Sequence, residues 1–103
     1  MLKWYEHYYI GEGVRDAEKI RKKINQGELV PGIYLLTLSE NPNNVMEILP
    51  AVSLKQETVR RLCPEIIGMA MGKEEAMVMV SELLPKIYEE TGTFHVQEYM
   101  KNR

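Results

Sequence analysis

The chain of 103 residues is 45% hydrophobic and 27% charged, with a formal net charge of −2 and a pI of about 5.7. This length fits a single α/β domain over residues 1–103, and the hydrophobic content argues against intrinsic disorder. The slightly acidic balance favours neither nucleic acid nor an anionic membrane as a partner, and no apolar run approaches the ~20 residues that span a bilayer.

The first predicted element is the aromatic-rich segment 4–10 (WYEHYYI), which ends at Gly11. Its composition favours a β-strand. The alternation is imperfect because Glu6 shares a face with Trp4, and a short helix over the same residues stays open as an alternative. The rings are expected to provide core and partner contacts rather than a ligand-binding lip, because Trp and Tyr bury large areas while keeping a polar tip.

A helix and a strand are predicted next. Apolar residues recur at three- and four-residue steps over residues 14–26, which indicates an amphipathic helix, and Gly27 provides its stop. Residues 33–39 (IYLLTLS) form a continuous apolar run of strand length, which is typical of a strand covered on both faces. The polar cluster at residues 39–44 (SENPNN) predicts a turn.

The second half is predicted to contain two more helices around a strand. Residues 45–62 are expected to form a helix that kinks or breaks at Pro50, because proline removes one helical hydrogen bond. Residues 65–71 (EIIGMAM) indicate a second buried strand. Residues 73–90 predict the longest helix, with a bend at Pro85.

The predicted order is β-α-β-α-β-α, with a short terminal helix added within residues 93–103. Strands separated by helices imply right-handed crossovers, so the expected fold is a small three-layer α/β domain with about three mostly parallel strands. Three helices leave part of the apolar strand surface uncovered. A second copy of the chain is therefore expected to cover it, as a homodimer.

The loops after the strands form the candidate binding site. In open parallel sheets these loops face a common crevice, which would bring residues 11–13, 39–44 and 71–73 to one rim. Backbone N–H groups, side-chain amides and two cations there suit a small polar or phosphorylated, nucleotide-like ligand. Ordinary turn and capping roles explain the same residues and are the favoured interpretation. The candidate residues are Gly11, Gly13, Arg15, Ser39, Asn43, Asn44 and Lys73.

Residues 11–40 approach the pattern of a dinucleotide-binding unit without meeting it. Gly11 and Gly13 stand between a predicted strand and a predicted helix, but the third glycine position is Asp16, which would repel a phosphate. Glu40, the acid that would bind ribose, lies farther along the chain than this pattern places it. A glycine-rich turn before the first helix is the simpler interpretation.

A phosphate-loop interpretation of residues 68–73 fails more clearly. The spacing between its glycines is one residue short, and Glu74 replaces the Ser/Thr that binds magnesium. Glu74 and Glu75 instead stand at a helix N-terminus, where negative charge is favourable. They are expected to occupy the position that a bound anion would take.

The sequence predicts neither a catalytic centre nor a metal site. Nucleophilic catalysis would need Cys63 with His7 or His95, and Glu98 as the orienting acid, and nothing in their spacing supports this set. Free cysteines are usually buried as small hydrophobic residues. Two histidines and one cysteine without ligand spacing predict no metal, and no cofactor is expected.

The remaining expectations concern partners and location. Arg15, Lys19, Lys22 and Lys23 form a basic stripe on the first predicted helix, which is interpreted as a solvated face rather than a nucleic-acid surface. A single cysteine cannot form an internal disulfide, and no secretory leader is expected, so the predicted location is cytoplasmic. The leading functional hypothesis is a non-catalytic interaction module that self-associates. The alternative is a domain that binds a small polar or phosphorylated ligand at the carboxyl ends of the strands.

Overall fold

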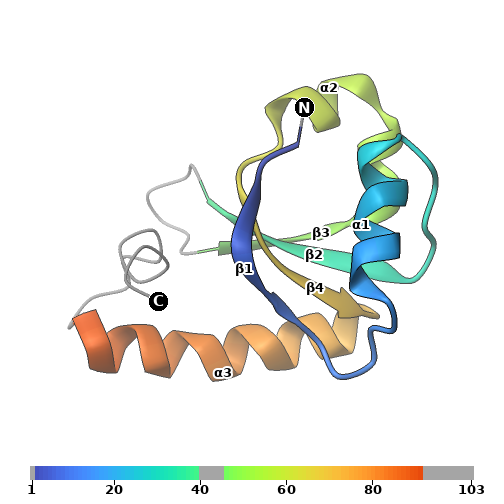
Figure 1. Cartoon of the computed structure of the whole chain (residues 1–103). Helices are drawn as coiled ribbons and strands as arrows, with labels where there is room; N and C mark the ends of the chain where they lie inside the picture. The colour runs from blue at the N-terminus through green and yellow to red at the C-terminus, as the bar shows by residue number, and fades with distance from the viewer. Residues whose placement is uncertain (1, 40–45, 92–103) are drawn as a thin grey trace.

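A computed structural model describes residues 2–39 and 46–91 of the chain (Figure 1). In these ranges the protein is a small mixed α/β domain with a four-stranded sheet, three α-helices and one short 3-10 helix. The strands are β1 (Trp4–Ile10), β2 (Ile33–Leu38), β3 (Met46–Pro50) and β4 (Ile66–Met71). The helices are α1 (Ala17–Asn25), η1 (Ala51–Lys55), α2 (Glu57–Leu62) and α3 (Lys73–Thr91).

The sheet has the strand order β1-β4-β2-β3, and the prediction of a mostly parallel sheet is wrong. β1 and β4 are parallel, whereas β2 runs antiparallel to both β4 and β3. The segment that contains α1 does not act as a parallel crossover, because β2 starts at the end of the sheet where β1 and β4 end, with the Gly72 N–H donating to the Gly32 carbonyl. β3 then pairs with β2 as its antiparallel neighbour.

The segment predicted as a helix over residues 45–62 begins with a strand. β3 pairs with β2 in register from Leu38 opposite Met46 to Tyr34 opposite Pro50. Proline directs the residue before it toward extended backbone, and an edge strand tolerates the missing N–H at its end. Short apolar runs such as MEIL fit a strand and a helix equally well, so this error follows from the ambiguity of the pattern.

The other predicted elements within the described ranges are confirmed. Residues 4–10 form a strand, which decides between the two alternatives left open for them. Gly27 ends α1 with a left-handed φ of +83°, and its N–H donates to the Ile24 carbonyl at 3.1 Å. α3 continues past Pro85 to Thr91. The helix predicted within residues 93–103 lies outside the described residues.

Two hydrophobic clusters pack against the two sides of the central strands. Neighbouring side chains of β2 point to opposite faces of the sheet. Leu35 belongs to the cluster that contains Ile24 of α1, whereas Leu36 belongs to the cluster that contains Leu83 of α3. Both central strands are thereby covered within one chain. Apart from Met71 at the end of β4, the exposed strand residues lie on the edge strands β1 and β3, so little of the uncovered strand surface that motivated the expected homodimer is found on β2 and β4.

Arg60 links α2 to η1 and to α1 by hydrogen bonds. Its Nε donates to the Leu54 carbonyl at 3.2 Å, and its guanidinium also donates to the Ile24 carbonyl near the end of α1. A helix of six residues is too short to be stable alone, so these bonds and the contact with η1 hold α2 in place.

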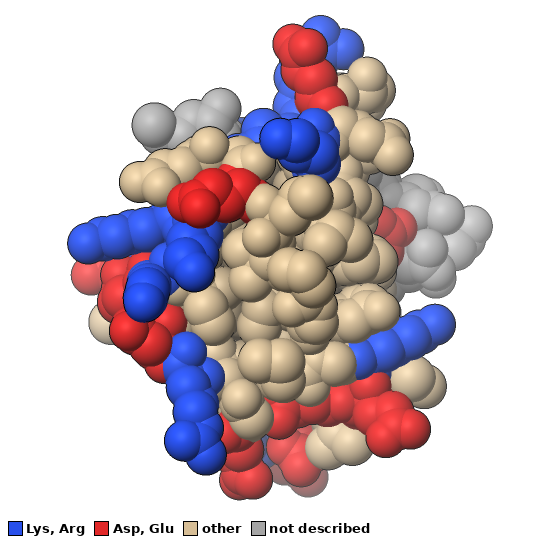
Figure 2. All heavy atoms as spheres, turned by 90° about the vertical axis from the view of Figure 1, so that its right-hand side faces the viewer, with Lys and Arg blue, Asp and Glu red and all other residues tan. Residues whose placement is uncertain are grey.

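Figure 2 shows the face of the molecule that lies at the right in Figure 1, where α1 is found. Lys and Arg side chains lie along the left flank, at the top and at the right, acidic side chains lie among them and along the lower edge, and uncharged side chains fill the centre. The basic residues Arg15, Lys19, Lys22 and Lys23 are exposed, as expected of a solvated stripe. This face therefore presents mixed charge rather than one continuous positive surface.

Candidate functional site

The carboxyl ends of β1 and β4 lie at the same end of the sheet, because these two strands are parallel. The Gly11 N–H donates to the Met69 carbonyl at 2.8 Å and continues the pairing beyond the end of β1. The Gly72 N–H donates to the Gly32 carbonyl at 2.7 Å, which brings the start of β2 to the same end of the sheet. The structure thus brings residues 11–13 together with residues 71–73, as predicted.

Ser39, from the third segment of the predicted rim, does not lie with residues 11–13 and 71–73. Ser39 follows the carboxyl end of β2, which points the opposite way because β2 is antiparallel to β4. Its hydroxyl donates to Glu47 of β3 at 3.2 Å, within the β2–β3 hairpin. Asn43 and Asn44 lie outside the described residues. Grouping Ser39 with the other candidates therefore fails, because it depended on parallel strands.

A carboxylate of the protein itself occupies the centre of the rim. Glu75 Oε1 accepts the Met71 N–H and Oε2 accepts the Gly13 N–H, each at 2.7 Å. A Cβ at Gly11 would lie 2.1 Å from Glu75 Oε1, so this position needs glycine while the carboxylate stays in place. The expectation that a glutamate takes the position of an anion is confirmed for Glu75. A phosphate at these N–H groups would have to displace it.

Local hydrogen bonds also cap the starts of the neighbouring helices α1 and α3. Asp16, at the third glycine position of the failed dinucleotide pattern, caps α1: it adopts φ 55° and its side chain accepts the Lys19 N–H at 3.4 Å. Gly72 adopts φ +88° and its carbonyl accepts the Ala76 N–H in the first turn of α3. Arg15 and Lys73 are exposed near these starts. The turn and capping interpretation thus accounts for the observed bonds.

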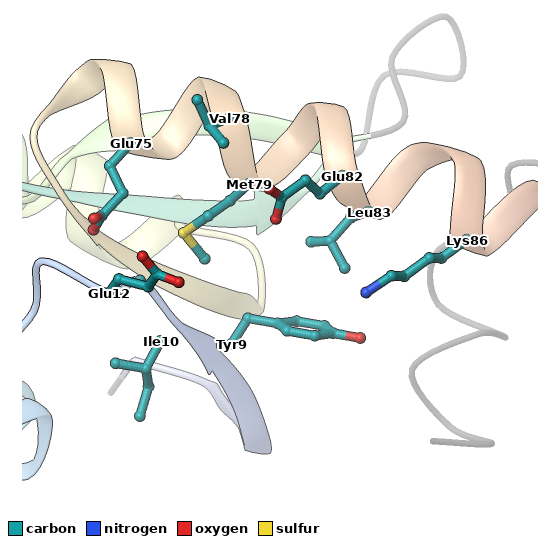
Figure 3. A pocket seen from close by; sticks show the side chains of 10 residues that line it. Tyr9, Ile10, Glu12, Glu75, Val78, Met79, Glu82, Leu83 and Lys86 are labelled. Carbon is teal, nitrogen blue, oxygen red and sulfur yellow. The ribbon is translucent and has the colours of Figure 1, made fainter.

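A groove of about 470 Å³ opens beside this rim, between the end of β1 and α3 (Figure 3). Its wall is formed by Tyr9 together with Met79 and Leu83 of α3, and Figure 3 shows the Glu82 carboxylate reaching in from the helix above them. The groove ends near Lys86 on one side. Sequence reasoning missed this groove, because residues from β1 and from α3 meet only through the fold.

A smaller groove of about 250 Å³ lies between β3 and α2, at the other edge of the sheet. Leu49 and Val59 line it, together with Leu62, whose side chain is 67% exposed. Glu47 is its acidic member. The lining is mainly apolar, so this groove is suited to side-chain packing rather than to polar chemistry.

Cys63 also borders the smaller groove, and its environment opposes nucleophilic catalysis. Burial raises the pKa of its thiol, although the charge of Arg60 acts in the opposite direction. The thiol donates to the Pro64 carbonyl at 3.3 Å. A protonated thiol is a poor nucleophile. His7 lies exposed on β1, and the other members of the considered set, His95 and Glu98, lie outside the described residues.

The aromatic residues of β1 have structural partners. The rings of Trp4 and Tyr8 pack with centroids 5.3 Å apart, and Trp4 Nε1 donates to Asn25 Oδ1 of α1 at 2.8 Å. Tyr9 contacts the second cluster, on the α3 side. This arrangement supports the prediction that the rings of the segment provide core contacts.

Comparison of the chain with protein-family models, with curated proteins and with solved structures finds no significant match. Across the described ranges, residues 2–39 and 46–91, no cluster of three or more potential metal ligands occurs. None of the helices in these ranges is long and apolar enough to cross a membrane. The function is therefore inferred from the two grooves and the rim.

Proposed function

We propose that the chain is a non-catalytic interaction module that associates with a second copy of itself through the groove between β3 and α2. The observation that carries this proposal is Leu62, which is 67% exposed and lines the groove that a partner's Leu62 would enter. A two-fold contact requires one surface to carry both a protruding side chain and the cavity that receives its counterpart. Leu62 and the adjoining groove meet this requirement.

Charges at the margin of the groove suit the same arrangement. Arg61 is exposed on α2, next to Leu62, and Glu47 is exposed on β3 across the groove. In a two-fold contact the arginine of one copy would face the glutamate of the other. Such exposed pairs contribute little affinity but favour one orientation.

The alternative function, binding of a small polar or phosphorylated ligand at the carboxyl ends of the strands, is less well supported. Glu75 already accepts the N–H groups of Gly13 and Met71, which an anion would need. Glu12 and Glu82 add negative charge to the neighbouring groove. A phosphorylated ligand would therefore meet both occupied donors and like charge.

Substitution of Leu62 tests the proposed self-association. Burial of one leucine side chain contributes about 1.5–3 kcal/mol, and a two-fold dimer buries two, so Leu62→Ser should weaken association by at least about a hundredfold. Light scattering after size-exclusion chromatography measures the mass over a concentration series. Leu29→Ser, which changes another side chain that is 56% exposed, should leave the mass unchanged. A monomeric wild-type protein, or a dimer that Leu62→Ser does not weaken, would contradict the proposal.

A further inference from the structure

The groove between β1 and α3 differs chemically from the self-association groove. We propose that it binds an extended segment of another protein in which a lysine or arginine stands next to apolar residues. The proposal does not rest on self-association, because the two grooves lie at opposite edges of the sheet.

The charge of the groove selects a cationic partner. Three carboxylates line it, from Glu12, Glu75 and Glu82, against the single ammonium group of Lys86. Figure 3 shows Glu12 and Glu75 near one end and Lys86 toward the other. Glu75 is held by two backbone N–H groups, whereas Glu12 and Glu82 are exposed and accessible to a new cation. A basic side chain would therefore be attracted to the end near Glu12.

The wall of the groove suits the aliphatic part of the same side chain. Tyr9, Met79 and Leu83 form an apolar surface beside the carboxylates, and Val78 at the margin is 53% exposed. Lysine and arginine pack their methylene stems on such surfaces while their charged ends stay hydrated. A volume of about 470 Å³ accommodates more than one side chain, so apolar neighbours of the cation would also be bound.

The open edge of β1 provides the backbone contacts that favour an extended segment. Gly11 donates toward β4, and alternate residues of a strand direct their N–H and C=O groups to opposite sides. The N–H and C=O of Ile10 therefore point to the open edge, away from β4. The Ile10 side chain is 52% exposed and points away from α3, so the edge beside it is accessible to a partner strand. Addition of a strand at such an edge is a common mode of peptide recognition.

A second copy of this chain is a poor occupant. The two edge strands that it would offer, β1 and β3, contain Glu6 and Glu47 and neither lysine nor arginine. Pairing either strand with β1 beside Glu12 and Glu82 would bring like charges together. The occupant is therefore a basic segment from a different protein.

Binding of labelled hexapeptides by fluorescence anisotropy tests this inference on the full chain. An alternating Val/Lys peptide should bind, more weakly as salt rises, whereas the matching Val/Glu peptide should not. Glu12→Gln and Glu82→Gln should each weaken binding about two- to fivefold, because each removes one exposed charge interaction. Glu28→Gln, an exposed acid on the loop after α1, is the matched control and should leave the affinity unchanged.

A Val/Lys peptide with proline at its central position tests the backbone contacts, and it should bind several times more weakly than the parent. Equal affinity of the proline peptide, or equal competition by the single amino acid lysine amide, would overturn the extended segment in favour of a lone cation site. Unchanged binding in both Gln variants would overturn the location. Because Leu62→Ser does not alter this groove, failure here is distinguishable from failure of the self-association.

Discussion

Gly11 is constrained by a side chain that lies far from it in the sequence. Its missing Cβ leaves room for the Glu75 carboxylate, which in turn binds the Gly13 and Met71 N–H groups. Gly11 has no left-handed φ, so an alanine there would be limited by space rather than by backbone conformation. The glycine and the glutamate should therefore be energetically coupled.

A double-mutant cycle on this pair makes the coupling measurable. Gly11→Ala should lower the free energy of unfolding by about 1–3 kcal/mol, because Glu75 must leave its two N–H donors. In the Glu75→Ala background the same substitution should cost much less, since the obstructing carboxylate is absent. Urea denaturation of the four proteins gives the coupling energy. Additive effects of the two substitutions would show that the contact is unimportant.

Tyr8 carries a buried hydroxyl that has no hydrogen-bond partner among the described residues, although only 8% of the residue is exposed. Burial raises the pKa of this phenol, the nearby charge of Glu18 raises it further, and Arg21 opposes both. The folded-state pKa thus lies above the unfolded value of about 10. The contribution of this raised pKa to the free energy of unfolding is fully present below about pH 10 and is lost as the pH rises through the folded-state pKa.

Tyr8→Phe should therefore change stability in two ways. Near neutral pH it should be neutral or stabilise the fold by up to about 1 kcal/mol, because it removes an unsatisfied buried group. Above about pH 10 it should reduce the loss of stability that the wild type shows. Cys63, whose pKa burial also raises, should retain part of the alkaline sensitivity. Thermal melts across pH provide the comparison, and an identical alkaline decline in both proteins would contradict this account.

At the scale of elements, Trp4 joins β1 to α1. Trp4→Phe keeps a ring against Tyr8 but loses the bond to Asn25, and should cost about 0.5–1.5 kcal/mol. Trp4→Ala also removes the ring contact, and should cost about 2–4 kcal/mol. Denaturant midpoints rank the three proteins. Retention of the full midpoint by Trp4→Ala, with a defect only in self-association, would show that the ring serves a partner rather than the core.

The elements that could be predicted from sequence are those with an unambiguous period or composition. Aromatic content identified β1, three- and four-residue spacing identified α1, and continuous apolar runs identified β2 and β4. β3 was missed because five residues that end in proline are too short to show a period. The direction of β2 relative to β4 could not be read either, since it depends on which strands the core brings together.

The same limit applies to the candidate site over the whole molecule. The expectation that a glutamate near the start of α3 would replace an anion was correct, because helix N-termini favour acids in any fold. Its partner Gly13 lies 62 residues away, and no local pattern indicates that distance. The larger groove is likewise formed by β1 and α3, which lie more than 60 residues apart in the sequence. The rim failed at Ser39 for the same reason, because one reversed strand moves a loop to the other end of the sheet.

The position of β4 between β1 and β2 also sets an order for folding during synthesis. The β2–β3 hairpin joins neighbouring segments and can form as soon as residue 50 has left the ribosome. β1 has no partner strand until β4 has been made, so its backbone N–H and C=O groups lack their sheet partners while some 55 further residues are added. The emerging chain is therefore most exposed to aggregation or to chaperone binding through its first ten residues. Closure of the sheet, followed by the Glu75 contact with Gly13, ends that period.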